Sequence, residues 1–415
     1  MQTHGCESHR TTPSSRRSYL ARLMAHVMRN GVSSVSSDLT PRCLLCEKRL
    51  SDETGSREHI IPNSIGGRKK VSGFLCVTCN STSGQSWESA LAEQMKPLSL
   101  FFRVKRDRGD TPSQAFQTAN GREWVLKSDG SLNLPRPVFN ETKTYKGVEI
   151  NISARDMAEA KKMLKGVARK YPQLDINELL EKAKTVSTYP QDQIRLNLSF
   201  GGLDAGRSFV KTALALLSTT SASPSECEHA VQFLKEEQAE PCFGYYYEKD
   251  LVVGRPTGVP VHCVHVNGDP DSQLVRGYLE YFGVMRVVMC LSSSYSGDEF
   301  SATYSVNPVT GEELDLAVDL DLTSSEITKA YDYEMWDGNA VRQAMGAVIG
   351  PTLENQHEEE KERVLNEAVQ YAFDNCGAIE GEELTEEQRK RWVSLLWEKM
   401  EPWIVHQIAG RQRGS

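Results

Sequence analysis

The chain has 415 residues, of which 39% are hydrophobic and 25% are charged. This composition is ordinary for a soluble protein and leaves room for two or three domains. The sequence contains no apolar run of about 18 residues, which excludes a protein built on membrane-spanning helices.

Charge is distributed unevenly along the sequence. Residues 1–110 hold 17 Lys and Arg against 10 Asp and Glu, whereas the whole chain has a net charge of −8. A basic end on an acidic body predicts attraction to phosphate groups at that end. Chance unevenness along the chain is the alternative interpretation.

Residues 1–40 are rich in Ser, Thr and Arg and predict a disordered tail or a short helix. Arg22 interrupts the apolar stretch Ser18–Ala25, so we expect no secretory signal. A transit peptide is conceivable, but a disordered tail or a short helix is the preferred interpretation. Four of the ten cysteines form spaced pairs, which favours metal binding in a reducing compartment. We therefore expect a cytoplasmic protein with no membrane partner.

The following segments predict an α+β fold, in which a small zinc-bound ββα module precedes a larger mixed α/β body. The expected regions are a cysteine module at 41–97, a mixed α/β region at 98–250, an antiparallel β region at 251–322 and a helical C-terminus at 323–415. The expected elements of the module are strands near Arg57–Ile61 and Val71–Leu75 and a helix that opens after Asn80 and runs to about Lys96, ended by Pro97. In the body we expect helices at Asn151–Tyr171, Ile176–Ala183, Ala205–Leu217, Ser223–Glu236 and Leu384–Ile408, and strands at Val259–Val266, Val275–Phe282 and Met285–Leu291.

Two Cys-x-x-Cys pairs stand at the two ends of the cysteine module. They are Cys43/Cys46 and Cys76/Cys79. Four thiolates in two such pairs are typical of tetrahedral zinc, and a closed four-cysteine site is structural because it leaves no position for a substrate. A zinc ion here would tie the loop before the first strand to the start of the helix.

Between the pairs lies the segment Glu58-His59-Ile60-Ile61-Pro62, and Asn80 directly follows the last cysteine. Together with Gly66-Gly67, these motifs resemble the four-cysteine branch of the HNH endonuclease family, whose phage resolvases share the ββα-metal plan. The resemblance covers about residues 41–97.

The resemblance implies a role for each residue of the predicted site. Glu58 and Asn80 would supply oxygen ligands to a catalytic Mg²⁺ or Mn²⁺. His59 would act as general base on the water that attacks phosphorus, and its ordinary pKa near ~6.5 suits that task. The implied reaction is metal-dependent hydrolysis of DNA, leaving 5′-phosphate and 3′-hydroxyl ends.

The sequence departs from the family pattern at several positions. Glu58 stands where many members have Asp, and Asn80 replaces a His, as it does in the resolvase-like members. The middle Asn of the family is absent, because Val71 and Ser72 stand near its expected place. Asn63 is close enough in sequence to contribute instead.

Other interpretations stay open. The module could be a zinc-stapled DNA-binding or scaffold finger without catalysis, in which Glu58 and His59 form an ordinary strand pair. The body could recognise substrate, respond to an activating ligand or partner protein, or assemble a homo-oligomer through the C-terminal helices. A role in phage defence rests on an analogy with the domain organisation of other nucleases alone.

His262 and His265 look like a metal pair, but core packing or surface exposure is the preferred interpretation. Seven basic residues flanking the module could contact phosphates: Arg68, Lys69, Lys70, Arg103, Lys105, Arg106 and Arg108.

Overall fold

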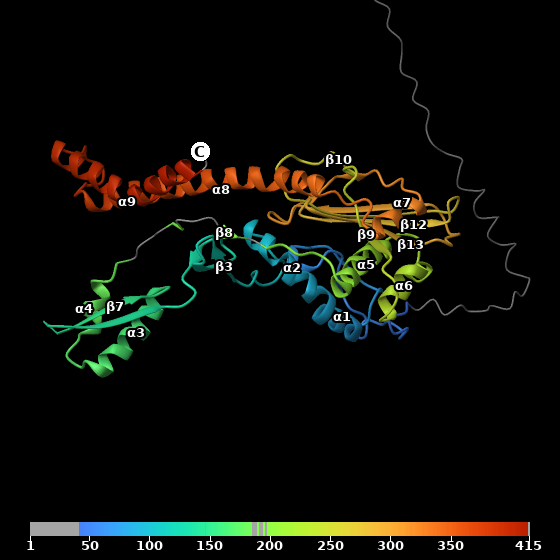
Figure 1. The fold of residues 1–415 in the computed structure, drawn as a ribbon, viewed down its shortest axis with the longest axis horizontal. Coiled ribbons are helices and arrows are strands. Elements are labelled where there is room, and N and C mark those ends of the chain that lie inside the picture. The colour runs from blue at the N-terminus through green and yellow to red at the C-terminus, as the bar shows by residue number, and fades with distance from the viewer. Residues whose placement is uncertain (1–40, 146, 185–188, 191–193, 196, 414–415) are drawn as a thin grey trace, which may run out of the picture. The chain divides into compact units, whose positions relative to one another are not determined.

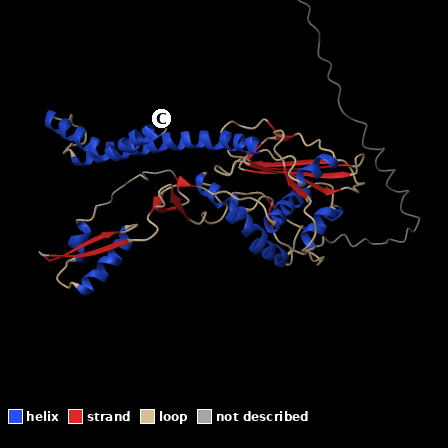
Figure 2. Ribbon diagram, viewed as in Figure 1, coloured by secondary structure: helices blue, strands red, loops and turns tan. Residues whose placement is uncertain are grey.

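The computed structural model describes residues 41–145, 147–184, 189–190, 194–195 and 197–413 (Figure 1). The predicted tail at residues 1–40 lies outside this range. The described chain combines helices with antiparallel sheets, so the predicted α+β class is confirmed (Figure 2). The predicted division of the chain into five regions stays a prediction.

The cysteine module has the expected ββα order. Its two strands pair antiparallel, with Glu58 opposite Val71 and His59 opposite Lys70. The pairing is short because Pro62 follows closely and has no backbone N–H to donate. The elements are β1 Glu58–His59, η1 Asn63–Ile65, β2 Lys70–Val71, α1 Val77–Ser83, η2 Gly84–Glu88 and α2 Ser89–Phe101.

The helix of the module begins earlier than predicted. It starts at Val77 rather than after Asn80, because the side chain of Cys76 caps it by accepting a hydrogen bond from the backbone N–H of Cys79. Capping satisfies a donor that the first turn would otherwise leave free. Asn80 is consequently inside the first helical turn.

The helix also ends later than predicted, because Pro97 lies inside α2, which continues to Phe101. Proline removes one intrahelical hydrogen bond and normally disfavours such a position. Here the residues that follow, Leu98 and Leu100, are fully buried. Their burial offsets the lost bond, at roughly 1.5–3 kcal/mol for each large apolar side chain.

A six-stranded antiparallel sheet forms the centre of the body, which confirms the predicted β-rich part. Its strand order is β15-β14-β11-β12-β13-β9. The strands of the body sheet and of the small β10–β16 pair are β9 Phe243–Tyr245, β10 Val252–Val253, β11 His262–Asp269, β12 Leu274–Tyr281, β13 Met285–Ser292, β14 Phe300–Val306, β15 Glu313–Leu314 and β16 Ala317–Val318.

Both faces of this sheet are buried. Along β11, Val264 and Val266 belong to one apolar cluster, while the intervening register position Cys263 belongs to a second. This alternation is that of a strand covered on both sides. The helices packed around the sheet are α5 Leu203–Leu217, α6 Glu228–Lys235 and α7 Ser324–Tyr331, with the short η3 Pro224–Glu226 before α6.

The cysteine module shares its core with the body. One continuous apolar cluster contains Ile60 and Leu91 of the module together with Phe209 of α5 and Val264 of the sheet. His262 of β11 adds a polar link, because its Nε2 donates to the backbone carbonyl of Ile65 at 2.7 Å. The body therefore helps to fix the geometry of the module.

The region between module and sheet carries smaller elements. The helix expected at Asn151–Tyr171 begins only after Asp156, which caps it, because residues 151–153 belong to a strand. The elements are β3 Gln114–Thr118, β4 Glu123–Leu126, β5 Leu132–Asn133, β6 Val138–Thr144, β7 Gly147–Ser153, α3 Met157–Lys170, α4 Ile176–Glu181 and β8 Ile194–Arg195.

The C-terminal part is helical, as predicted. It consists mainly of α8 Gly338–Asn375 and α9 Glu386–Arg413, which pack against each other. Gln356 of α8 donates to the carbonyl of Phe101 at the end of α2, at 2.7 Å. Within the described part of the chain, no helix is both long and apolar enough to cross a membrane.

Candidate functional site

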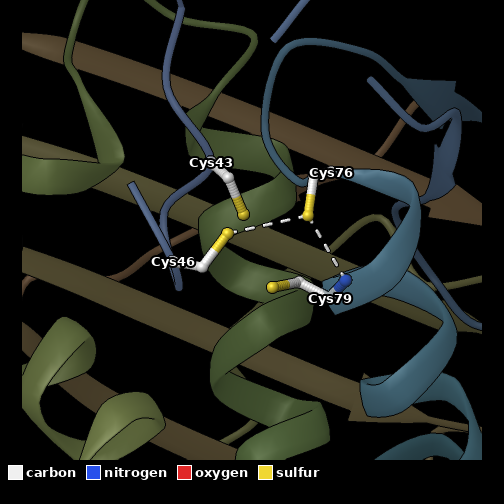
Figure 3. A group of neighbouring side chains, drawn as sticks. All are labelled: Cys43, Cys46, Cys76 and Cys79. Carbon is white, nitrogen blue, oxygen red and sulfur yellow. Dashed lines mark hydrogen bonds between the residues drawn. The ribbon is translucent and has the colours of Figure 1, made fainter. Parts of the chain in front are cut away.

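The four cysteines of the two pairs converge at the start of α1 (Figure 3). Cys43 and Cys46 come from the loop before β1, and Cys76 and Cys79 from the start of the helix. Their sulfur atoms all lie within 4.8 Å of one another, and none of the four is in a disulfide.

The geometry of this cluster suits zinc. Four Zn–S bonds of ~2.3 Å in a tetrahedron place neighbouring sulfurs about 3.8 Å apart. The Sγ atoms of Cys46 and Cys76 are 3.7 Å apart. All four donors are thiols, so the cluster is suited to a closed structural site rather than to a catalytic one.

His59 is buried in β1, beside a carboxylate from the loop after α2. Its Nε2 is 3.3 Å from Oδ2 of Asp107. The same oxygen accepts a hydrogen bond from Nζ of Lys70 at 2.7 Å. Lys70 is the cross-strand partner of His59, and such partners share one face of a sheet.

The surroundings of His59 favour its neutral form. Burial lowers the pKa of His59 below its ordinary value, and the nearby charges of Lys70 and Arg108 act in the same direction, while Asp107 opposes them. Hydrogen bonds from Lys70 and then His59 lower the pKa of Asp107 to about 2. At neutral pH the pair is thus an uncharged imidazole beside an ionised carboxylate.

Glu58 points to a different set of partners. One of its carboxylate oxygens lies 2.9 Å from Nζ of Lys211, which comes from α5 in the body. The same ammonium is 2.6 Å from Oε1 of Glu88 in η2. The side chains of Glu58 and Lys211 are only 5% and 3% exposed, so this is a buried ionic group.

Two carboxylates around one ammonium leave an excess of negative charge. Burial first, and the charge of Glu88 second, raise the pKa of Glu58 to about 8, although Lys211 counteracts both. When both carboxylates are ionised, the cluster of Glu58, Glu88 and Lys211 carries one net negative charge in a region shielded from water. Its carboxylate oxygens are the donors that a hard divalent cation takes.

Asn80 is the third residue of the predicted site. It lies in α1 and is half-buried, and within the described residues its carboxamide makes no hydrogen bond to Glu58 or His59. Its backbone N–H bonds to the carbonyl of Cys76 at 2.9 Å, which keeps it in the helix. Consecutive strand residues face opposite sides, which explains why Glu58 and His59 have different partners. Convergence of all three predicted residues stays a prediction.

The family of the cysteine module follows from its sequence. Residues 43–96 match the model of the HNH endonuclease family. The cysteine module is an HNH endonuclease segment. No curated protein and no solved structure matches the chain.

Three residues that contact Glu58, His59 or their partners were not predicted from the sequence. Asp107 lies beyond the matched segment, within residues 103–108, which were considered only for their basic side chains. It is the single acidic residue of that stretch, and this was the signal that could have identified it. Glu88 and Lys211 gave no comparable signal, since each is one charged residue on an amphipathic helix.

Several of the basic residues beside the HNH module bond to the protein itself. Arg68 donates to the carbonyl of Lys105 at 2.9 Å, and Arg106 to that of Asp110 at 3.0 Å. Arg103 pairs with Glu359 of α8 at 2.8 Å. These contacts give part of the basic stretch a structural role and leave phosphate contact by the others as a prediction.

Proposed function

We propose that this protein is a metal-dependent HNH-type endonuclease that hydrolyses DNA phosphodiester bonds. The observation that carries the proposal is a four-thiol cluster of zinc geometry in the same module as a buried imidazole held by a carboxylate. The four cysteines and His59 belong to a segment that matches the HNH endonuclease family, and the carboxylate of Asp107 lies beyond it. The zinc would be structural, and the chemistry would take place at His59.

His59 is the proposed general base. A neutral imidazole is the form that can take a proton from an attacking water, and the lowered pKa of His59 favours that form at neutral pH. Lys70 and Arg108 lie near enough to influence His59 electrostatically, and positive groups at this place would attract a DNA phosphate.

Glu58 and Asn80 are the proposed ligands of a catalytic Mg²⁺ or Mn²⁺. When bound, such an ion supplies positive charge to the phosphoryl oxygens and to the leaving 3′ oxygen. Support comes from the buried carboxylate of Glu58 and the partly buried carboxylate of Glu88, which share one ammonium. Glu58 and Asn80 would each offer one side-chain oxygen to the ion.

The body is proposed to direct or restrain the nuclease. Lys211 of α5 contacts the predicted ligand Glu58, and His262 of the sheet holds the loop of Ile65, so changes in the body can reach the site. The nine cysteines of the described chain are free, which agrees with a reducing, cytoplasmic setting. Phage defence and assembly through α8 and α9 are extensions of this proposal by analogy.

The competing function is a zinc-finger DNA-binding or scaffold protein without catalysis. The contact of Lys211 with Glu58 favours this alternative, because a ligand already neutralised by an ammonium has less need of a metal ion. A zinc-finger protein without catalytic activity would bind DNA in a salt-dependent manner and leave the DNA uncut.

A plasmid assay separates the two functions. Purified full-length protein is incubated with supercoiled DNA in Mg²⁺, in Mn²⁺ and in excess chelator, and zinc content and DNA binding are measured on the same sample. The nuclease predicts metal-dependent nicking or linearisation with ligatable 5′-phosphate ends. Tight binding with intact plasmid in every metal would contradict it.

A further inference from the structure

The HNH module lacks the middle asparagine of its family, since Val71 and Ser72 stand near the expected place. The imidazole of His59 nevertheless has a partner. Nε2 of His59 lies 3.3 Å from Oδ2 of Asp107, a residue of the loop that follows α2. This loop lies outside the segment 43–96 that matches the family. The contact therefore joins a residue of the matched segment to one beyond it.

The position of Asp107 is itself fixed by the module. Oδ1 of Asn63 accepts the backbone N–H groups of Asp107 and Arg108, at 2.8 and 3.2 Å. Nδ2 of Asn63 donates to the carbonyl of Arg108 at 3.2 Å. One carboxamide thus clamps two consecutive residues of the loop through three hydrogen bonds. Asn63 belongs to η1 and lies four residues after His59 in the sequence. Its hydrogen bonds therefore hold the loop after α2 against the segment that carries His59.

Lys70 completes the arrangement. It lies opposite His59 in the β1–β2 pair and bonds Oδ2 of Asp107 at 2.7 Å. The carboxylate is therefore held by two donors on one side of the strand pair. An ionised carboxylate accepts the N–H of a neighbouring imidazole and so selects which ring nitrogen carries the proton.

We propose that Asp107, presented by Asn63, is the positioning residue of His59 in place of the missing asparagine. The carboxylate accepts the Nε2–H of the imidazole and fixes the ring, which leaves the lone pair of Nδ1 to accept a proton from water. This assignment rests on the proposed nuclease function. It adds two residues to the site, one of them outside the recognised segment.

A tautomer measurement tests the positioning without any need for activity. The full-length protein is labelled with ¹⁵N-histidine, and the His59 signals are assigned by their loss in His59→Gln. At pH 8 the proposal expects the proton on Nε2 in the parent protein, and a mixture of both tautomers in Asp107→Ala. Asp110→Ala is the matched control from the same loop, because within the described residues the carboxylate of Asp110 makes no hydrogen bond or ion pair. An identical tautomer population in the parent and in Asp107→Ala overturns the proposal.

Kinetics on a DNA substrate provide the second test. We expect Asp107→Ala to lower kcat by about 10- to 100-fold with little change in KM, because a mispositioned base acts on the chemical step. Asp107→Asn keeps an oxygen acceptor and should retain more of kcat than Asp107→Ala. Asn63→Ala should lower kcat in the same direction, and Asp110→Ala should match the parent.

The two tests separate failure of the positioning from failure of the nuclease function. If the parent cuts DNA and His59→Ala does not, yet Asp107→Ala cuts at the parental rate, the positioning role is refuted and the nuclease stands. If the parent does not cut DNA under any metal, the nuclease function fails, and the tautomer measurement alone then decides whether Asp107 sets the imidazole.

Discussion

His262 should make the folded protein sensitive to acid. It is fully buried in β11, where Nε2 donates to the carbonyl of Ile65 at 2.7 Å and Nδ1 accepts the N–H of Phe282 at 3.0 Å. Both bonds require the neutral ring with its proton on Nε2. Protonation would place a hydrogen on Nδ1, facing the N–H of Phe282, and would put an unpaired charge in the core.

The magnitude follows from the pKa of this group. Burial lowers the pKa of His262 to about 4, although the hydrogen bond to Ile65 opposes the change. An unfolded histidine titrates near ~6.5, so the difference corresponds to about 3 kcal/mol of folding free energy at neutral pH. Because the folded pKa is the lower one, this contribution is present above pH ~6.5 and is lost as the pH falls toward about 4.

Urea unfolding of the full chain, followed by tryptophan fluorescence, measures the loss between pH 7.5 and 4.5. The matched variant is His262→Gln, which can donate and accept a hydrogen bond but does not titrate. Zinc release and the titration of His265 affect both proteins equally, so the difference between their pH profiles isolates His262. The exposed His229→Gln should follow the parent. Parallel loss of stability in the parent and in His262→Gln would show that the buried His262 does not cause the acid sensitivity.

Three further perturbations have defined outcomes. In Gly67→Ala the added Cβ would lie 1.7 Å from the carbonyl oxygen of Ile61, so thermal unfolding should show a loss of several kcal/mol, and an unchanged Tm would contradict the loop geometry. Lys211→Met removes the ammonium that Glu58 and Glu88 share and should lower the unfolding free energy by about 3 kcal/mol. Adding Glu58→Gln and Glu88→Gln together should restore most of that loss, and failure of this triple variant to recover would argue against the buried ionic group. Cys46→Ser should reduce the zinc content measured by atomic absorption from about one ion per chain to near zero, whereas retention of the ion would exclude a four-thiolate site.

The features that the sequence predicted well are local ones. The cysteine spacing alone predicted that the four thiols form one cluster, because a Cys-x-x-Cys pair brings two sulfurs together in a tight loop or a first helical turn. Helix α5 was predicted within two residues, since its apolar positions recur at helical spacing. The antiparallel character of β11 to β13 likewise followed from short apolar runs separated by turns.

The features that the sequence missed depend on contacts between distant segments. Pro97 marks a helix end by local rules, but burial of the residues after it carries the helix onward. Asp107 meets His59 only because the loop after α2 folds back on the strand pair. Lys211 meets Glu58 only because α5 packs on the module. No spacing rule within one segment could have predicted either pairing.

The proton-accepting role of His59 is tested most directly by single-turnover cleavage of a labelled DNA duplex in Mg²⁺. Parent, His59→Ala and the exposed-residue control His229→Ala are compared at equal zinc content. A general base contributes about 100-fold or more to such a rate, so the His59→Ala rate should fall by at least that factor, while the control stays at the parental rate. Equal rates for the parent and His59→Ala would contradict the account.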